Sequence, residues 1–231
     1  VHFPVANPNG DNQVEGGKGD DVVTGDIGGI VTETQAAANY NIALVVDTSG
    51  SMDWAISNEQ GAVKRIDAVK SALINMLTEM ADHSGTINVA LIGFSGTATL
   101  KFELDDLEPF DLNSYYYGID DAINALTADG ATNYESAFDT TQNWFAEQPS
   151  NGFENLTFFL TDGVPTVSNS HSSNGSTTEL DEFVDSVRAF EELSKVSTVR
   201  AIGIGDGIES DVLQFFDNTS ANSAAFSKTE T

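Results

Sequence analysis

Long apolar runs without polar alternation mark this sequence from about residue 39 onward. The first occupies residues 42–46 and ends at Asp47. Such a run is typical of a strand that is buried on both faces of a parallel sheet. Similar runs recur at 87–94, 156–160 and 199–204. We therefore predict that these four segments form the buried strands of one sheet.

Apolar residues at helical spacing occupy the segments between these strands. The clearest set predicts one long amphipathic helix. It comprises Val63, Ile66, Val69, Leu73, Met76, Leu77 and Met80. Shorter patterns predict further helices at 115–126, 134–145, 180–190 and 211–216. Alternating polarity at 97–104 indicates an antiparallel edge strand, and residues 224–227 fit a last edge strand.

Strands that alternate with helices of this length require crossover connections, which are right-handed and produce a mainly parallel sheet. We therefore expect an α/β fold: a doubly wound, mainly parallel sheet with helices on both faces and one antiparallel edge strand. Ligand sites of such sheets lie at the carboxyl ends of the strands, so the polar residues that follow each strand are the first candidates for function.

Residues 1–37 differ in composition from the rest, being rich in Gly, Asn and Asp and poor in large apolar side chains. We place a domain boundary there, with residues 38–231 forming the α/β domain, and expect a monomeric domain within a longer protein. Residues 16–24 fit the nonapeptide G-G-x-G-x-D-x-U-x of calcium-binding β-rolls. Its candidate ligands are Asp20, Asp21 and Asp26. Because a stable roll needs several repeats, the segment is either a flexible linker or an arm held by an additional Ca²⁺.

The 231-residue chain is strongly acidic, with 36 Asp and Glu against nine Lys and Arg and a formal net charge of −27. This charge excludes nucleic acid as a partner and disfavours an anionic membrane surface. The sequence has no run of 18 apolar residues for membrane insertion, and it has no cysteine for disulfide bonds or thiolate sites. Cations are the natural partners of such a surface.

Hard oxygen ligands stand beside three of the predicted elements. They are Asp47, Ser49 and Ser51 after the first strand, Thr132 before the helix at 134–145, and Asp162 after the strand at 156–160. Because the carboxyl ends of parallel strands meet at one edge of a sheet, we expect these side chains to face one point. Two carboxylates and three hydroxyls suit Mg²⁺ or Ca²⁺. With so few carboxylates, the ion would keep positive charge for a carboxylate of a partner.

Each of these residues also has a local alternative role. Ser, Thr and Asp are favoured helix caps, so the side chains in 47–51 would cap the turn after the strand. Residues 132–135 match the capping box T-x-x-E, and Asp162-Gly163 is an ordinary turn signal. The acidic stretch at 103–111 is either a second cation site or a solvated loop.

The same motifs resemble those of the von Willebrand factor type A (vWA) domain family. Residues 47–51 match its D-x-S-x-S motif, residues 130–133 its threonine loop and residues 161–163 its third loop. The resemblance spans roughly residues 39–227. It implies a Rossmann-like sheet with a metal-ion-dependent adhesion site, whose ion bridges to an acidic group of a protein or glycan partner. Ala131 departs from the family pattern, which often has a second glycine there, and the C-terminal helix of the family is not expected within these 231 residues.

The nonapeptide in the N-terminal segment resembles the calcium repeats of bacterial RTX proteins. Together with the absence of cysteine and the acidic surface, this resemblance implies an RTX adhesin that type I secretion exports to the bacterial cell surface. The sequence therefore predicts a divalent-metal-dependent adhesion domain with an extracellular location.

Two other functional classes, a metal-dependent hydrolase and a calcium-stiffened structural module, would use the same oxygen ligands. A metal-dependent hydrolase needs a base near the ion, whereas the three histidines, His2, His83 and His171, lie outside the ligand motifs. Neither a G-x-S-x-G elbow nor a P-loop occurs, so we expect no enzyme. A calcium-stiffened structural module would use the same ligands without an open coordination position. Trp54, just after the first motif, is interpreted as a contact residue or a loop anchor.

Overall fold

A computed structural model describes residues 37–58, 61–113, 118–171, 175–205, 208 and 210–219 of the chain. The N-terminal Gly/Asp-rich segment with its calcium repeat and the strand expected at 224–227 lie outside these ranges. Residues 115–117, at the start of the helix expected at 115–126, also lie outside these ranges. Residues from Ala38 onward form one unit, which contains every helix and strand of the described residues.

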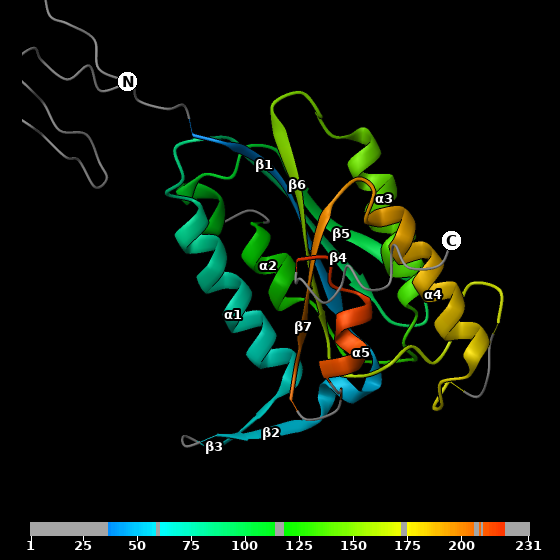
Figure 1. Cartoon of the computed structure of the whole chain (residues 1–231). Coiled ribbons are helices and arrows are strands. Elements are labelled where there is room, and N and C mark those ends of the chain that lie inside the picture. The colour runs from blue at the N-terminus through cyan, green and yellow to red at the C-terminus, as the bar shows by residue number, and fades with distance from the viewer. Residues whose placement is uncertain are drawn as a thin grey trace, which may run out of the picture. The chain divides into compact units, whose positions relative to one another are not determined.

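The centre of this unit is a five-stranded sheet in the order β5-β4-β1-β6-β7 (Figure 1). Its strands are β1 (Asn39–Asp47), β4 (Ile87–Phe94), β5 (Ala98–Leu104), β6 (Phe153–Thr161) and β7 (Thr198–Gly203). The neighbours β4, β1, β6 and β7 are parallel, whereas β5 pairs with β4 antiparallel at the edge. The predicted α/β fold with a mainly parallel sheet and one antiparallel edge strand is confirmed.

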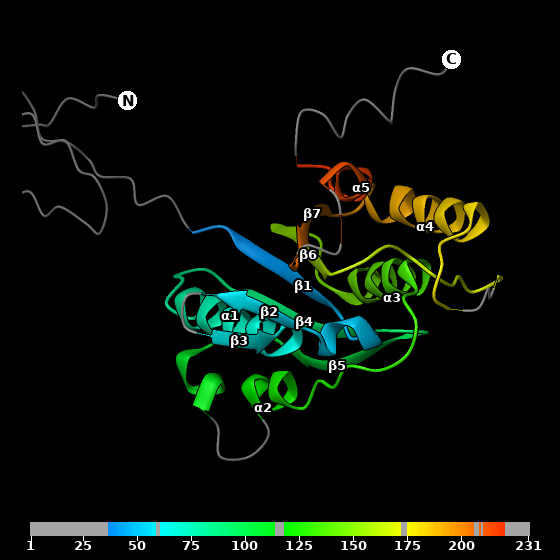
Figure 2. The same ribbon diagram turned by 90° about the horizontal axis from the view of Figure 1, so that it is seen from below.

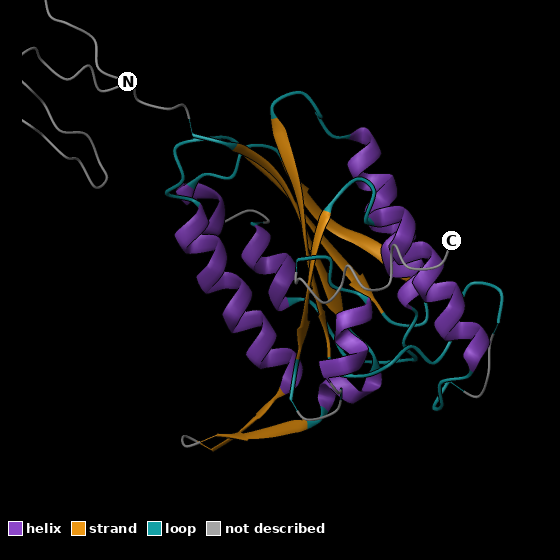
Figure 3. Cartoon of the chain, in the orientation of Figure 1, coloured by secondary structure: helices purple, strands orange, loops and turns teal. Residues whose placement is uncertain are grey.

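Helices cover both faces of the sheet, as Figures 2 and 3 show. One face carries α1 (Arg65–Met80) and α2 (Ile119–Asn124); the other carries α3 (Tyr134–Glu147), α4 (Leu180–Leu193) and α5 (Ser210–Phe215). Leu44 and Val46 of β1 pack toward α1, while Ala43 and Val45 pack toward α3. Both faces of β1 are therefore buried, which explains the absence of polar alternation in this run. None of the helices within the described ranges is long and apolar enough to cross a membrane.

The strand register aligns the carboxyl ends of the central strands. Asp47, the last residue of β1, pairs with Phe94 of β4, and Val46 pairs with Leu160 of β6. Asp162 follows β6 two residues after Leu160, at the level where β1 ends. The loops after β1 and β6 consequently start next to each other at one edge of the sheet.

A β-hairpin that the sequence pattern did not predict precedes α1. It consists of β2 (Ala55–Asn58) and β3 (Gly61–Lys64). Figure 1 shows the hairpin projecting beyond the end of the sheet. The predicted inclusion of Val63 in the long helix is wrong, because Val63 pairs with Ile56 in the hairpin and α1 begins at Arg65. Val63 lies three residues before the first apolar position of α1, so it fits the helical period although its backbone is extended.

Candidate metal centre

Asp47, at the end of β1, is completely buried among neutral hydrogen-bond donors. The Ser49 amide donates to Asp47 Oδ1 (2.8 Å), and the Thr161 hydroxyl donates to Asp47 Oδ2 (2.7 Å). No ion pair of Asp47 occurs within the described ranges. Burial raises the pKa of this carboxyl from 3.8 to about 6, against the lowering effect of the hydrogen bonds, and the nearby Asp162 carboxylate adds to the rise. Asp47 is thus a buried carboxyl without a compensating positive charge.

The two serines that follow carry a chain of side-chain hydrogen bonds to the loop after β6. Ser49 Oγ lies 3.1 Å from Ser51 Oγ, and Ser51 Oγ donates to Asp162 Oδ1 (2.7 Å). Ser49 precedes the 3-10 helix Gly50–Asp53, but its side chain makes no capping hydrogen bond there. These hydroxyls therefore link two loops instead of capping the local turn.

The loop that contains Thr132 is attached to the first loop by backbone hydrogen bonds. The Gly50 amide donates to the Gly130 carbonyl (3.0 Å), and the Asp129 amide donates to the Thr48 carbonyl (2.8 Å). Gly130 has a φ of 88°, a left-handed conformation that glycine adopts without strain. The threonine loop is thereby held next to the loop that carries Ser49 and Ser51.

Thr132 does not cap α3, so the alternative interpretation of residues 132–135 as a capping box is wrong. The N-cap is Asn133, whose side chain accepts a hydrogen bond from the Ser136 amide (2.9 Å). Thr132 is buried, and its hydrogen bonds with other described residues involve its backbone groups. Helix capping therefore does not compete with cation binding for the Thr132 hydroxyl.

Asp162 contacts a positive charge that no sequence motif indicated. Arg65 Nη1 donates to Asp162 Oδ2 at 2.7 Å, and the two side chains are only 10% and 0% exposed. The guanidinium carbon of Arg65 lies 5.5 Å from the centroid of the Trp54 ring, which is 64% exposed. The paired residues are 97 positions apart in the sequence, so their contact arises only from the tertiary fold.

Tyr134 and Thr161 support Asp47 from the side of α3. The Tyr134 hydroxyl lies 3.0 Å from Thr161 Oγ1 and donates to the carbonyl of Gly163. Burial raises the pKa of Tyr134 well above its usual value, so the hydroxyl remains a hydrogen-bond donor. In the sequence, Tyr134 is only one of the apolar positions of a helix, and its polar role could not be inferred from that pattern.

The oxygen donors of these loops suit a hard divalent cation. Asp47 and Asp162 supply carboxylates, and Ser49, Ser51 and Thr132 supply neutral hydroxyls, which Mg²⁺, Mn²⁺ and Ca²⁺ accept. Among the residues that the structure describes, no group of three or more His, Cys, Asp or Glu side chains could hold a metal ion. A cation at this position would therefore meet only two protein carboxylates and would keep positive charge for an external ligand.

A family model described as the von Willebrand factor type A domain matches residues 42–164, which is more than half of the chain. The chain belongs to the von Willebrand factor type A domain family. The matched span contains all five candidate ligands of this vWA domain. A search among curated proteins finds no match to the sequence.

Solved structures of bacterial and parasite proteins share the fold of this vWA domain. The pilus adhesin SpaC from Lactobacillus rhamnosus GG has a TM-score of 0.56 at 20% identity, over 80% of this chain and 28% of that chain. The PilB minor pilin from Streptococcus sanguinis has a TM-score of 0.54 at 20% identity, over 79% and 55% of the respective chains. Manganese-loaded Plasmodium vivax TRAP has a TM-score of 0.52 at 21% identity, over 78% and 62%. Our chain spans less than two thirds of each of these chains, and such identities show the fold alone.

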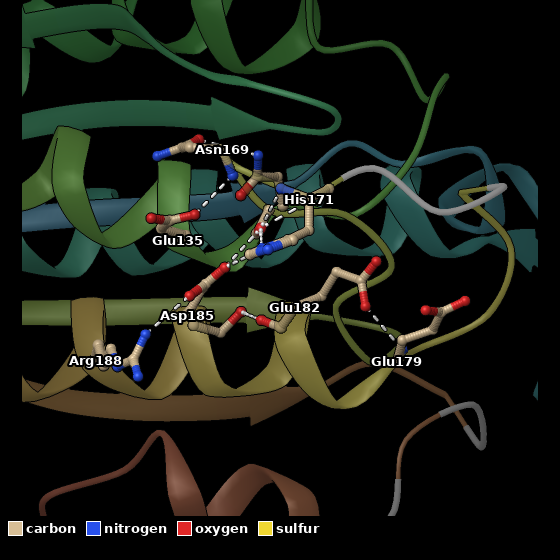
Figure 4. A network of polar contacts seen from close by, with 10 residues as sticks. Glu135, Asn169, His171, Glu179, Glu182, Asp185 and Arg188 are labelled. Atoms are coloured by element: carbon tan, nitrogen blue, oxygen red, sulfur yellow. Dashed lines mark hydrogen bonds and ion pairs between the residues drawn. The ribbon is translucent and has the colours of Figure 1, made fainter.

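In the vWA domain, a network of polar contacts holds the segment after Asp162 against α3 and α4 (Figure 4). Asp185 on α4 accepts a hydrogen bond from Ser168 Oγ (2.9 Å) and contacts His171 Nδ1 (2.8 Å). Glu135 on α3 accepts a hydrogen bond from the Asn169 amide (2.6 Å). The segment is thus anchored on two helices at once.

The same segment also contacts the threonine loop. The Thr132 carbonyl accepts hydrogen bonds from the Thr166 amide (2.8 Å) and the Val167 amide (3.2 Å). The Thr132 amide in turn donates to the Thr166 hydroxyl (3.0 Å). The contacts on α3 and α4 therefore help to position a candidate cation ligand.

Ser168, His171 and Asp185 do not form a hydrolytic relay, although all three residue types of a catalytic triad are present. In such a triad the imidazole lies between the serine and the carboxylate and uses a different nitrogen for each. Here Ser168 donates directly to Asp185, and Nδ1 of His171 is the nitrogen near both groups, at 2.8 Å from Asp185 Oδ2 and 3.5 Å from Ser168 Oγ. This geometry is that of a loop anchor.

We expect the anchor to be strongest when His171 is protonated. The hydrogen bond to Asp185 raises the pKa of His171 above 6.5, with the Asp185, Asp181 and Glu182 carboxylates adding to the rise. Because the folded-state pKa exceeds the unfolded value, the stabilising contribution is complete below about pH 6.5 and is lost as the pH rises through the raised pKa. The pKa of Asp185 is lowered by the same hydrogen bond, so its contribution is lost only in acid.

An NMR titration of the His171 ring measures this effect directly. Asp185→Asn should return the His171 pKa toward its usual value, whereas the control Asp181→Asn, which removes a nearby charge without the hydrogen bond, should lower it less. An unshifted His171 pKa in the wild-type protein would contradict the interpretation.

Proposed function

We propose that this vWA domain binds one divalent cation through Asp47, Ser49, Ser51, Thr132 and Asp162. The bound cation would hold a carboxylate of a partner molecule. The observation that carries the proposal is the hydrogen-bonded convergence of two buried carboxylates and two serine hydroxyls from the loops after β1 and β6. A bound cation would also compensate the buried charge of Asp47, which lacks an ion pair within the described ranges.

The partner in this proposal is a protein or a glycan that carries an accessible carboxylate. The fold shared with a pilus adhesin and a minor pilin supports an adhesive role, and the manganese-loaded relative supports a divalent ion. We infer Mg²⁺ or Ca²⁺ as the ion and the surface of a bacterial cell as the location. The calcium repeat at 16–24 adds the inference of further Ca²⁺ and of export as part of an RTX adhesin.

Isothermal titration calorimetry with MgCl₂, MnCl₂ and CaCl₂ tests the cation site. We expect one site for Mg²⁺ or Mn²⁺ in the wild-type protein, and at least about tenfold weaker binding of these ions in Thr132→Ala, because a ligand hydroxyl is lost. Ca²⁺ should show this site and, if the repeat at 16–24 binds, further sites that Thr132→Ala leaves unchanged. The matched control is Thr127→Ala, at an exposed threonine of the preceding segment, which should bind the cation normally. Equal affinity in the wild-type protein and Thr132→Ala would remove Thr132 from the proposed ligands.

Crystals of the cation-loaded domain soaked in sodium acetate distinguish adhesion from a calcium-stiffened structural module. An acetate oxygen bound to the cation would support an open coordination position and hence carboxylate recognition. A coordination sphere closed by protein atoms would instead favour the structural module.

A further inference from the structure

The Arg65 side chain is buried beside Asp162, with Trp54 and Gly205 as further neighbours. The Trp54 ring lies over the guanidinium, and a Cβ atom at Gly205 would approach Arg65 Nε to 2.9 Å. Gly205 has a φ of 72°, so both the space and the backbone conformation favour glycine at this position. The guanidinium therefore packs between the Trp54 ring and the backbone at Gly205.

One donor of the Arg65 guanidinium lacks a hydrogen-bond partner among the described residues. Its Nη1 donates to Asp162 Oδ2, while its Nε is buried and has no hydrogen-bond partner among the described residues. A buried donor without a partner destabilises the folded protein. Despite this cost, the guanidinium places a full positive charge in direct contact with Asp162, one of the proposed cation ligands.

We propose that Arg65 is an internal counter-charge that weakens cation binding and thereby keeps the bound cation electrophilic toward the partner. The inference rests on the proposed cation site. With Asp47 and Asp162 ionised, Arg65 reduces the net charge of the centre from −2 to −1. It also occupies Asp162 Oδ2, so that Oδ1, which accepts from Ser51, is the oxygen on the side of the serine hydroxyls.

Two electrostatic effects lead from this arrangement to function. The guanidinium repels a divalent cation, which lowers the affinity of the site, because charges interact strongly in a partly buried environment. The same net charge of −1 leaves more of the charge of the cation uncompensated, which strengthens its attraction to a carboxylate from outside. Arg65 would thus weaken the binding of the cation to the protein and strengthen the binding of the partner's carboxylate to the cation.

Calorimetry on Arg65→Gln tests the proposal, with the full chain as protein and MnCl₂ as the probe. We expect the variant to bind Mn²⁺ at least about tenfold more tightly than the wild-type protein, because a like charge is removed from a partly buried centre. Acetate binding to the Mn²⁺-loaded variant should be weaker. Without metal, the variant should unfold at a lower temperature, because Asp162 loses its ion pair.

Two further variants keep the test decisive. Lys64→Gln removes the same charge one residue away, at a half-exposed lysine that pairs with Asp53, and should leave the Mn²⁺ affinity nearly unchanged. Arg65→Lys retains the charge and should stay close to the wild-type affinity even if Arg65→Gln fails to fold.

The outcomes separate this proposal from the proposed cation site. Equal or weaker Mn²⁺ binding by Arg65→Gln would overturn the counter-charge role and leave Arg65 as a support for Asp162. Tight binding by Arg65→Lys, well beyond that of the wild-type protein, would overturn it as well. If neither the wild-type protein nor Arg65→Gln binds Mn²⁺, the cation site and this inference both fail. Binding by the variant alone would support the inference.

Discussion

Asp47→Asn should make the cation-free domain more stable at pH 8 while abolishing cation binding. Burial raises the pKa of Asp47 from 3.8 to about 6, so the folded state binds the proton more tightly than the unfolded state. The ionised carboxylate therefore destabilises the fold above about pH 6, by roughly 3 kcal/mol when converted at 1.36 kcal/mol per pKa unit. Asparagine removes this loss but weakens the hydrogen bond from Thr161, so we expect a net gain of about 1–2 kcal/mol.

Differential scanning calorimetry in EDTA at pH 8 and pH 4.5 measures this gain. The advantage of Asp47→Asn should shrink at pH 4.5, because the wild-type carboxyl becomes protonated below its folded-state pKa. The control Asp129→Asn, at an exposed aspartate of the neighbouring loop, should change the melting temperature little at either pH. A lower melting temperature of Asp47→Asn at pH 8 would show that the buried charge is not a net burden on the fold.

Phe159→Ala should cause the largest loss of stability among single substitutions near the centre. Phe159 lies in β6 two residues before Thr161 and is fully buried. Its ring centroid lies 5.3 Å from that of Phe94, 4.7 Å from that of Tyr134 and 4.8 Å from that of Phe138. Truncation removes these contacts and leaves a cavity, which typically costs about 3–5 kcal/mol.

Urea unfolding provides the measurement, with a lower midpoint and an unchanged slope as the expected result. Phe158→Ala is the matched control, because Phe158 is the adjacent residue of the same strand, is only partly buried and packs on the other face. We expect it to lose clearly less stability. Equal losses of stability for the two variants would mean that the aromatic contacts around Tyr134 stabilise the fold no more than the contacts of Phe158 on the other face of the sheet.

The sheet could be predicted from the sequence because its apolar runs have a single physical interpretation. The run at 87–94 coincides with β4, and the alternation at 97–104 differs from β5 by one residue. The β2–β3 hairpin could not be found in this way. Its residue Val63 satisfies both the extended period and the helical period of α1, and only the pairing with Ile56 decides between them.

In the candidate centre, too, residues of a local motif could be predicted from the sequence, whereas residues that depend on tertiary contacts could not. Asp47, Ser49 and Ser51 follow one another at intervals of two residues, so the motif that groups them can be read directly from the sequence. The contact of Arg65 with Asp162 and that of Tyr134 with Thr161 both join residues that are far apart in the sequence. Such contacts exist only after folding, and they cannot be predicted from a basic or aromatic residue at the start of a helix.

The β2–β3 hairpin has a consequence for how domains of this kind can diverge. It is inserted between Trp54 and Arg65, and the Arg65 amide closes its base by donating to the Trp54 carbonyl (3.0 Å). Lengthening a loop costs the fold only about 0.6 kcal/mol for each doubling of its length. Insertions into the hairpin can therefore accumulate without disturbing the sheet or the oxygen ligands. New recognition surfaces could in this way evolve, or be grafted, beside an unchanged centre.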